Sequence, residues 1–210
     1  MRGKFITLEG GEGCGKTTQI ALLADALRAE GIEVRTTREP GGTQLGERIR
    51  GILKEVSAEP LCDRSELLLF LAARAQLVHD VIAPALARGV WVLSDRFCDS
   101  TYAYQGYGRG LPLEAIRQAD GFARAGLLPD KTFLLCADPA ACRRRMQERE
   151  SRTQTAADRI EQAGDVFHAR LRAGFSALAA ADPGRIQPID ANGTVEEVQE
   201  RIWKALKPLI

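Results

Sequence analysis

A glycine-rich segment at residues 10–17, with the sequence GGEGCGKT, constrains the fold of this chain more than any other feature. It fits the phosphate-binding pattern G-x-x-x-x-G-K-[ST], which joins the end of a strand to the start of a helix. The flanking sequence agrees, because residues 5–8 are apolar or β-branched and apolar residues then recur at helical spacing from Ile20 to Leu27, before Gly31. The segment is therefore expected to be a loop between a strand and a helix N-terminus.

This loop has the chemistry of a phosphate site. Its glycines allow successive backbone N–H groups to point into one concavity, and the helix after Gly15 adds its partial positive charge. Lys16 is expected to reach the outer phosphates and Thr17 to offer its hydroxyl to Mg²⁺. The phosphates of ATP or GTP are the expected ligand, and a chance match in a glycine-rich turn is the alternative. The predicted ATP-binding residues are Gly10, Gly11, Glu12, Gly13, Cys14, Gly15, Lys16, Thr17 and Thr18.

Short β-rich segments alternate along the chain with longer segments whose apolar residues recur every three or four positions. This alternation is typical of a parallel sheet with helices on both faces, so the expected fold class is α/β, of the P-loop NTPase type. The five expected strands lie at residues 5–8, 33–36, 90–93, 132–136 and 185–189, and the last two helices at 158–181 and 194–206. Thr194 and Glu197 fit a capping box at the start of the last helix.

No repeat, low-complexity tract or linker rich in Gly, Ser and Pro divides the sequence, so residues 1–210 are expected to form a single domain. Residues 143–157 differ from the rest because they are rich in charged and polar residues and contain few apolar ones. Such a segment cannot bury much surface, and it is predicted to be a mobile lid.

The charge balance argues against polyanionic partners. There are 29 Lys and Arg against 28 Asp and Glu, a formal net charge of +1, so neither nucleic acid nor a membrane surface is an expected partner. The most apolar stretch, residues 67–93, contains Arg74, His79, Asp80 and Arg88, and a transmembrane helix is not expected there. No signal peptide is recognised, and the five scattered cysteines fit neither a disulfide framework nor a zinc site, so a cytoplasmic location is expected.

Switches, motors and kinases share this type of loop, so other residues must indicate the reaction. The sequence lacks the Asn-Lys-x-Asp guanine motif of GTPases and the Leu-Ser-Gly-Gly-Gln motif of transport ATPases. Instead, Arg38 and Arg96 each follow a predicted strand. In a parallel sheet such loops face one crevice, where two arginines could bind a second phosphate, that of an acceptor. Solvated surface arginines are the alternative.

Four further segments, together with residues 10–17, resemble the bacterial thymidylate kinase family. They are the run TREPGGT at residues 37–43, the pair Phe70 and Arg74, the run DRFCDSTYAYQG at residues 95–106, and DRIE at residues 158–161. These segments span nearly the whole chain in the family's order. The resemblance implies transfer of the γ-phosphate of ATP to dTMP, giving dTDP and ADP, with Mg²⁺ as the metal ion and a homodimer built on the apolar helix at residues 67–86.

The resemblance also implies a pocket for dTMP. Phe70 and Arg74 are four positions apart on one helix face, so Phe70 is expected to stack on the base and Arg74 to donate to thymine O4. Core packing is the alternative for Phe70. By resemblance, Thr101 and Gln105 contact the base edge and Tyr104 lies against the sugar. The implied dTMP-binding residues are Glu12, Arg38, Phe70, Arg74, Arg96, Thr101, Tyr104 and Gln105.

Two carboxylates are implied to lie near the reacting phosphates. Asp95 ends a strand and matches the family's carboxylate that holds Mg²⁺ through water beside Thr17, with a helix cap as the alternative. Glu12 occupies the loop position whose carboxylate, in this family, faces the acceptor sugar and phosphate. The predicted metal ligands are therefore Thr17 and, through water, Asp95.

Position 13 bears on the source of a catalytic cation. Some members of the family carry arginine there, whereas others have a small residue and supply arginine from the lid. With Gly13 this chain resembles the second group, and the lid arginines would neutralise charge during phosphoryl transfer. The predicted catalytic residues are Lys16, Arg96, Arg149, Arg152 and Arg159.

Two alternative functions remain open. Another nucleoside-monophosphate or deoxynucleoside kinase would differ in the pocket formed by Phe70, Arg74, Thr101 and Gln105. A non-catalytic nucleotide switch would bind nucleotide without acceptor-dependent turnover, and the paired loop arginines argue against it.

Overall fold

A parallel sheet with the strand order β2-β3-β1-β4-β5 lies at the centre of the molecule. The computed structural model describes residues 2–153, 159 and 163–210, without the side chains at 149, 152 and 153. Within this part the strands are β1 (Phe5–Glu9), β2 (Val34–Arg38), β3 (Trp91–Asp95), β4 (Lys131–Cys136) and β5 (Ile186–Asp190). Every predicted strand is present within one or two residues of its expected position, so the α/β fold class is confirmed.

Strand β1 holds the middle of the sheet, paired with β3 on one side and β4 on the other. Its five residues are all buried, because helices cover both faces of the sheet. The chain proceeds from β1 towards β2 and β3 on one side and later towards β4 and β5 on the other. The carboxyl end of β1 is therefore the point where a parallel sheet of this kind opens a crevice for ligands.

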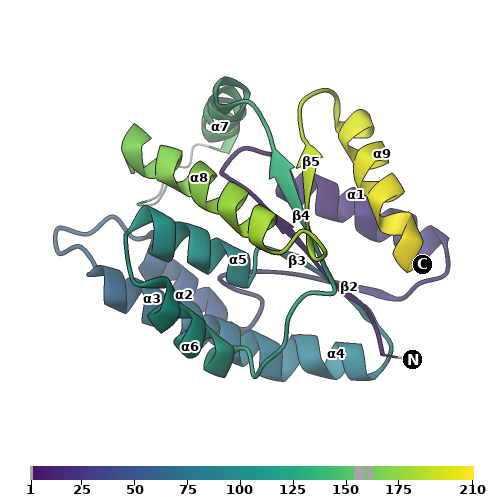
Figure 1. The fold of residues 1–210 in the computed structure, drawn as a ribbon, viewed down its shortest axis with the longest axis horizontal. Coiled ribbons are helices and arrows are strands. Elements are labelled where there is room, and N and C mark those ends of the chain that lie inside the picture. The colour runs from purple at the N-terminus through teal and green to yellow at the C-terminus, as the bar shows by residue number, and fades with distance from the viewer. Residues whose placement is uncertain (1, 154–158, 160–162) are drawn as a thin grey trace.

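Helices lie on both faces of this sheet, as Figure 1 shows. On one face are α1 (Lys16–Ala29) and α9 (Val195–Leu206). The remaining helical segments are α2 (Gln44–Lys54), α3 (Asp63–Leu77), η1 (Val78–Ile82), α4 (Ala83–Ala87), α5 (Cys98–Thr101), η2 (Tyr102–Gly108), α6 (Leu113–Ala123), α7 (Pro139–Thr153), α8 (Asp165–Ala181) and η3 (Lys207–Leu209). The predicted capping box of α9 is confirmed, because Thr194 accepts from the backbone of Glu197 and the Glu197 side chain accepts from the backbone of Thr194.

The alternation of side chains along the strands divides the core between the two faces. Leu8 of β1 packs with Leu23 of α1 and Ile202 of α9, and all three side chains are fully buried. On the opposite face, Val92 of β3 belongs to a second cluster with Ile82 of η1. Each such side chain stabilises the fold by about 1.5–3 kcal/mol through burial, so both helix layers hold the sheet in place.

The helical run Asp63–Ala87, which joins α3, η1 and α4, has the length and hydropathy of a membrane-spanning helix. Its contacts are those of a core helix, because Leu77 and Ile82 pack against Phe5 of β1 and Val92 of β3 in one buried cluster. Arg74, in the middle of the run, is 1% exposed and ion-paired. The buried part of the run is accounted for by its place beside the sheet.

The segment predicted to be a lid is largely helical, because α7 extends from Pro139 to Thr153. The side chain of Asp138 accepts from the backbone of Ala140 at 2.6 Å and so caps the helix. Low hydropathy does not prevent this helix, since its Arg, Gln, Glu and Ala residues are good helix formers. Residues 154–157 of the predicted lid lie outside the described part. The helix expected from residue 158 begins at Asp165.

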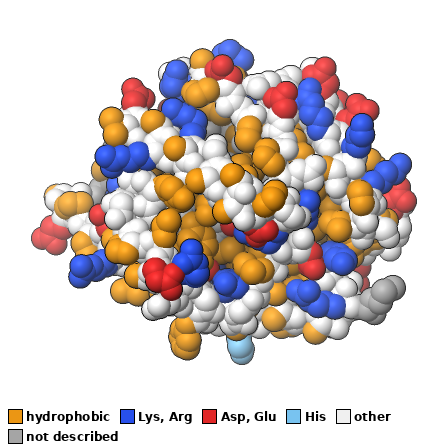
Figure 2. Space-filling model, in the orientation of Figure 1, with side chains coloured by type: hydrophobic (Ala, Val, Ile, Leu, Met, Phe, Trp, Pro, Cys, Tyr) orange, Lys and Arg blue, Asp and Glu red, His pale blue; other side chains and the backbone are white. Residues whose placement is uncertain are grey.

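Charges of both signs are interspersed with hydrophobic side chains on the face drawn in Figure 2. No single-sign region dominates this face, in agreement with the formal net charge of +1. All five cysteines are free thiols, as expected, and Cys62 and Cys136 among them are exposed.

Candidate functional site

A cleft of about 1050 Å³ opens at the carboxyl ends of β1, β2 and β3. It is bordered by the glycine-rich loop, by the loops after β2 and β3, and by parts of α3, η2 and α7. Most of the residues predicted from the sequence meet here. They are Glu12, Gly13, Gly15, Lys16, Thr17, Thr18, Arg38, Phe70, Arg74, Asp95, Arg96, Thr101, Tyr104 and Gln105. Gly10 and Cys14 are buried within the same loop.

The glycine-rich loop turns through backbone conformations that favour glycine. Gly13 and Gly15 have φ angles of 72° and 97°, in the left-handed region. The ammonium of Lys16 curls back over the loop, donating to the carbonyl oxygens of Gly11 at 2.8 Å and Gly10 at 3.2 Å. The lysine is thus held against the loop at the start of α1, beside the helix N-terminus.

Thr17 and Asp95 meet beside this loop, where the Thr17 hydroxyl donates to Asp95 Oδ2 at 2.7 Å. A hydroxyl and one carboxylate suit Mg²⁺, which keeps several waters and takes few protein ligands. Among the described residues, no group of three or more His, Cys, Asp and Glu side chains could hold a metal ion. Water and phosphate oxygens would therefore have to supply the other ligands. The pair therefore fits a Mg²⁺ ion that arrives with a phosphate ligand.

Arg96 has a left-handed backbone, with φ at 73°, which is unusual for a residue other than glycine. The neighbouring groups hold this conformation, because its N–H donates to the carbonyl of Leu8 at 3.0 Å and its carbonyl accepts from the Ser94 hydroxyl at 2.7 Å. The guanidinium then reaches across to the glycine-rich loop, donating to Gly10 O at 2.8 Å and to Glu12 Oε1 at 2.6 Å. The strained turn aims this cation into the cleft.

Glu12 joins Arg96 to Tyr104. The phenol of Tyr104 donates to Glu12 Oε1 at 3.0 Å, and the Arg96 guanidinium lies 4.9 Å from the centre of the Tyr104 ring. Burial raises the pKa of Tyr104, so the phenol keeps its proton. Glu12 therefore accepts hydrogen bonds from both Arg96 and Tyr104 and holds the two side chains in fixed positions.

Glu9, a residue that the sequence analysis did not single out, supports Arg96 from behind. Its carboxyl group accepts from the backbone N–H of Phe97 at 2.8 Å and from the Ser100 hydroxyl at 2.6 Å. Ser100 in turn accepts from Arg96 at 3.0 Å. Burial, reinforced by the charge of Asp99, raises the pKa of Glu9 from 4.5 to about 8.

Arg38 is on the opposite side of the cleft, with its side chain 54% exposed. It donates to Glu47 Oε2 at 3.0 Å, while Glu47 Oε1 accepts from the backbone N–H of Gly42 at 2.9 Å. The Gly42 hydrogen bond lowers the pKa of Glu47, which is therefore charged. This anchored arginine stays accessible to a ligand.

Arg74 differs from the expectation of a simple ligand donor, because it is buried between two carboxylates. It donates to Glu39 Oε2 through Nη2 at 2.6 Å and through Nε at 2.9 Å, and to Asp120 Oδ1 through Nη1 at 2.6 Å. Nη2 also donates to the Thr101 hydroxyl at 2.9 Å. Burial alone would lower the pKa of Arg74, but these carboxylates raise it above its usual value. Arg74 therefore has a structural role, as the cation that pairs with two buried carboxylates.

Sequence reasoning did not identify Glu39 and Asp120, the partners of Arg74. Nor did it identify Glu66, a buried carboxylate on α3. A usable signal exists for Glu66, because residues 66, 70 and 74 are spaced by four and so share one face of the helix. A charged residue at a buried helical position needs partners from other elements.

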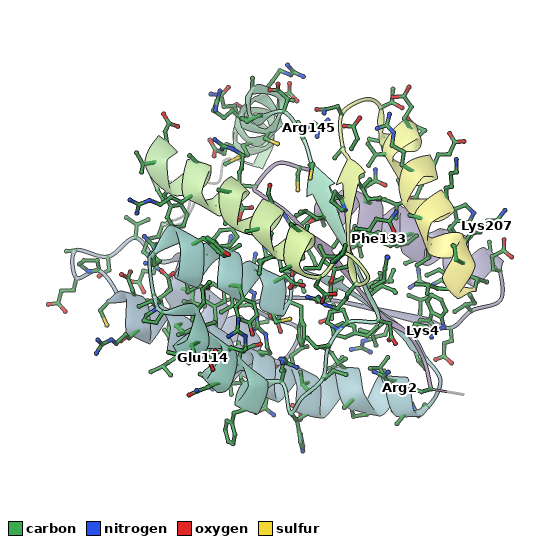
Figure 3. All side chains as sticks on the ribbon, in the orientation of Figure 1. Arg2, Lys4, Glu114, Phe133, Arg145 and Lys207 are labelled. Atoms are coloured by element: carbon green, nitrogen blue, oxygen red, sulfur yellow. The ribbon has the colours of Figure 1, made fainter. Side chains whose placement is uncertain are left out.

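The helix α7 closes over the glycine-rich loop. A Cβ atom added at Gly13 would lie 2.5 Å from the carbonyl oxygen of Cys142, so no side chain fits there in this arrangement. Arg145 and Met146 of α7 border the cleft. Figure 3 shows Arg145 on α7, at the end of the molecule where β4 and β5 terminate. Arg145 lies in the predicted lid, but the sequence analysis chose Arg149, Arg152 and Arg159 as the lid arginines and so missed it.

The predicted lid arginines fall into two groups. The side chains of Arg149 and Arg152 lie outside the described part of the structure. Arg159 does not itself line the cleft. It donates to Glu66 Oε2 at 2.5 Å and, at 3.4 Å, to the carbonyl of Leu53, which borders the cleft. A catalytic role for Arg159 at the phosphates therefore finds no support in its contacts.

Comparison with known proteins gives one family. The thymidylate kinase family matches residues 8–202. The curated thymidylate kinase of Synechococcus sp. (strain JA-3-3Ab) is 52% identical over 204 residues, covering 97% of this chain and 95% of that protein. That of Deinococcus radiodurans is 49% identical over 207 residues, covering 98% and 97%. The crystal structure of thymidylate kinase from Ehrlichia chaffeensis has a TM-score of 0.78 at 35% identity and covers 99% of both chains.

The ion pairs of Arg74 lead to a prediction about stability. Replacing Arg74 by Ala removes the cation that pairs with the buried carboxylate of Glu39 and leaves Asp120 paired with Arg124, and breaking a buried pair costs about 3–5 kcal/mol. Urea unfolding should show this loss. Arg64→Ala, at an exposed position of the same helix, is the control and should change stability by less than about 0.5 kcal/mol. A loss below about 1 kcal/mol in Arg74→Ala would contradict the structural role.

A second prediction concerns the pH dependence of stability. The folded protein holds a proton on Glu9 up to about pH 8, whereas an unfolded Glu releases it near 4.5. Between these values the folded state binds more protons, so its stability must fall as the pH rises, by at most about 1.4 kcal/mol per pH unit. Glu9→Gln cannot ionise and should lack this component. Thermal unfolding across this range should show wild type losing stability relative to the variant, and parallel pH profiles would be inconsistent with a raised pKa.

Proposed function

This chain belongs to the thymidylate kinase family and phosphorylates dTMP to dTDP with ATP as the phosphoryl donor, and we propose that the cleft at the carboxyl ends of β1, β2 and β3 performs this transfer. One observation supports the assignment above all: Lys16 of the glycine-rich loop borders the same cleft as Arg38 and Arg96. Phosphoryl transfer requires a donor site and an acceptor site that face each other, with cations between them.

The donor phosphates are proposed to bind at the glycine-rich loop. The N–H groups of the loop and of the first turn of α1 would donate to phosphate oxygens. Lys16, now held by the carbonyls of Gly10 and Gly11, would transfer its ammonium hydrogen bonds to the outer phosphates. Thr17 and Asp95 would hold Mg²⁺, directly and through water respectively, and the ion would neutralise phosphate charge when bound.

The acceptor phosphate is proposed to bind between Arg96 and Arg38. The backbone contacts of Arg96 and its bond to Glu12 fix the guanidinium before any ligand arrives, so little ordering remains to be done on binding. Arg38 approaches from the other side and remains half exposed. Tyr104, fixed by Glu12, would border the deoxyribose.

The base is proposed to lie between Phe70 and the edge formed by Arg74, Thr101 and Gln105. Phe70 is half-buried, packs with the cluster of Ile49 and borders the cleft, which suits a ring that stacks on a pyrimidine. Arg74 is committed to Glu39 and Asp120, yet its Nη1 makes one bond among the described residues and carries two N–H groups. The second N–H is available for thymine O4.

The lid is proposed to supply a further cation to the reacting phosphates. Arg145 borders the cleft, and positions 145, 149 and 152 follow one another at helical spacing. We therefore add Arg145 to Arg149 and Arg152 as candidates and remove Arg159, whose guanidinium is bound to Glu66. The three candidates share a helix that lies against Gly13.

Replacing Lys16 by Ala tests the donor side. The Lys16 ammonium stabilises negative charge that develops on the transferred phosphoryl group. Without it, kcat for dTMP phosphorylation should fall by about 10²-fold or more. A coupled assay for ADP formation gives kcat, and calorimetry should show unchanged dTMP affinity. Lys204→Ala, at an exposed site on α9, is the matched control and should retain wild-type turnover. Normal turnover in a folded Lys16→Ala enzyme would remove this loop from the mechanism.

The remaining proposals concern the surroundings of the enzyme. Five free cysteines suit a reducing compartment, so we propose a cytoplasmic location, which cell fractionation can test. With a net charge of +1, the chain has no excess of positive charge that would attract nucleic acid or an acidic membrane surface, so we propose neither as a partner. A single domain is proposed because one central sheet carries both helix layers.

A homodimer is proposed from exposed apolar side chains on the neighbouring helices α3 and α6. Leu68 is 62% exposed and Phe122 is 91% exposed. Sedimentation should give twice the chain mass of 22.9 kDa, and the double variant Leu68→Glu/Phe122→Glu should sediment as a monomer. Val166→Glu, at an equally exposed position on α8, is the control and should leave the mass unchanged. A monomeric wild type would rule out this proposal.

A further inference from the structure

Glu66 is a buried charge that the proposed transfer does not use. It lies on α3, 1% exposed, and is hydrogen-bonded to Gln105, which borders the cleft. Its Oε1 accepts from Gln105 Nε2 at 2.8 Å, and its Oε2 accepts from Arg109 Nη2 at 3.1 Å and from Arg159 Nη2 at 2.5 Å. One carboxylate thus joins α3, η2 and the segment before α8.

The charge state of Glu66 determines what Gln105 can do. Burial alone favours the neutral acid, but the hydrogen bond from Gln105 and the charge of Arg109 lower the pKa of Glu66 below its usual value. A carboxylate only accepts hydrogen bonds. The amide nitrogen of Gln105 must therefore face Glu66, whichever way the amide would otherwise turn.

The opposite end of the amide follows from this constraint. Gln105 is 1% exposed and borders the cleft together with Thr101 and Arg74. With its nitrogen held by Glu66, the group that remains for a ligand is Oε1, which can only accept. The base side of the cleft therefore offers an acceptor from Gln105 and a donor from Arg74.

This pair of groups matches one kind of pyrimidine edge. Thymine and uracil carry an N–H donor at N3 and an acceptor at O4, whereas cytosine carries an acceptor at N3 and a donor at N4. If Gln105 Oε1 faced N3 of cytosine, two hydrogen-bond acceptors would oppose each other with no donor between them, which is costly in a buried site. A Gln105 amide turned the other way would reverse the preference at N3.

We propose that Glu66 is a specificity-determining positioning residue, which holds the Gln105 amide with its oxygen towards the cleft and thereby selects nucleotides with an N3–H over cytidine-type nucleotides. This inference rests on the proposed function, since it requires the base to lie beside Gln105. Glu66 itself touches no substrate. Its effect passes through one hydrogen bond, that to Gln105 Nε2.

The test is the ratio of kcat/KM for dTMP to kcat/KM for dCMP. In Glu66→Gln the new amide can donate as well as accept, so Gln105 is free to turn. The ratio should fall by about tenfold or more, which corresponds to the free energy of one hydrogen bond. The change should appear mainly in the KM values for the two nucleotides, because the base does not react. An unchanged ratio in a folded Glu66→Gln enzyme overturns the proposal, as does an equal loss with both substrates.

Arg109→Gln separates specificity from stability. It removes the bonds of Arg109 to both oxygens of Glu66, while the bond from Gln105 and the charge of Arg159 remain to keep the pKa of Glu66 low and its carboxylate charged. Its thermal stability should fall while the ratio stays at the wild-type value, and a changed ratio would contradict the proposal. If Glu66→Gln does not fold, the double variant Glu66→Gln/Arg109→Gln removes both charges and is compared with Arg109→Gln.

A double-mutant cycle tests the route through Gln105. Gln105→Leu deletes the amide, so adding Glu66→Gln in that background should leave the ratio unchanged. A further fall of similar size in the Gln105→Leu background would mean that Glu66 acts by another route. Absence of dTMP-dependent ADP formation in the wild type would instead contradict the function itself, so the two failures are distinguishable.

Discussion

The guanidinium of Arg74 lies between the carboxylates of Glu39 and Asp120, and the acceptor side of the cleft is assembled around it. Three segments meet there, because Glu39 follows β2, Arg74 lies on α3 and Asp120 on α6. Burial of one cation with two anions is costly unless hydrogen bonds compensate for it, and the bidentate contact to Glu39 and the bond to Asp120 supply such hydrogen bonds. The carboxyl end of β2, which carries Arg38, is positioned relative to α3 by the same contacts. The contacts at this end of the cleft are therefore in place without a ligand.

A second set of contacts positions the reacting end of the cleft. Two carboxylates near the end of β1 have different environments, since Glu9 is buried behind the turn whereas Glu12 lies in the loop. Glu12 is bound to the guanidinium of Arg96, while Glu9 accepts from the backbone after Arg96 and from Ser100. The left-handed backbone at Arg96 persists because these neighbours hold it on both sides. This turn places the arginine opposite the glycine-rich loop.

Much of the fold and part of the site follow from local sequence. The glycine-rich loop, the strands and the capping box of α9 were predictable, because each depends on residues close together in the chain and on their periodicity. The helix α7 was also accessible to local reasoning. The lack of apolar residues led to the prediction of a lid, which stays a prediction, and no helix was predicted there, although helix formers and a capping aspartate suffice for a solvated helix.

The sequence by itself determined that the glycine-rich loop, Arg38 and Arg96 reach one cleft, since the carboxyl ends of parallel strands must share one edge of the sheet. Only the tertiary structure decided which charges meet. Arg74 and Glu39 are 35 positions apart, and Arg159 and Glu66 are 93 apart, so no spacing rule relates them. The direction of the Gln105 amide, the buried position of Glu9 and the departure of Arg159 from the cleft all depend on such distant partners. A buried polar group takes its role from the groups that satisfy it, and those are chosen by packing rather than by neighbouring sequence.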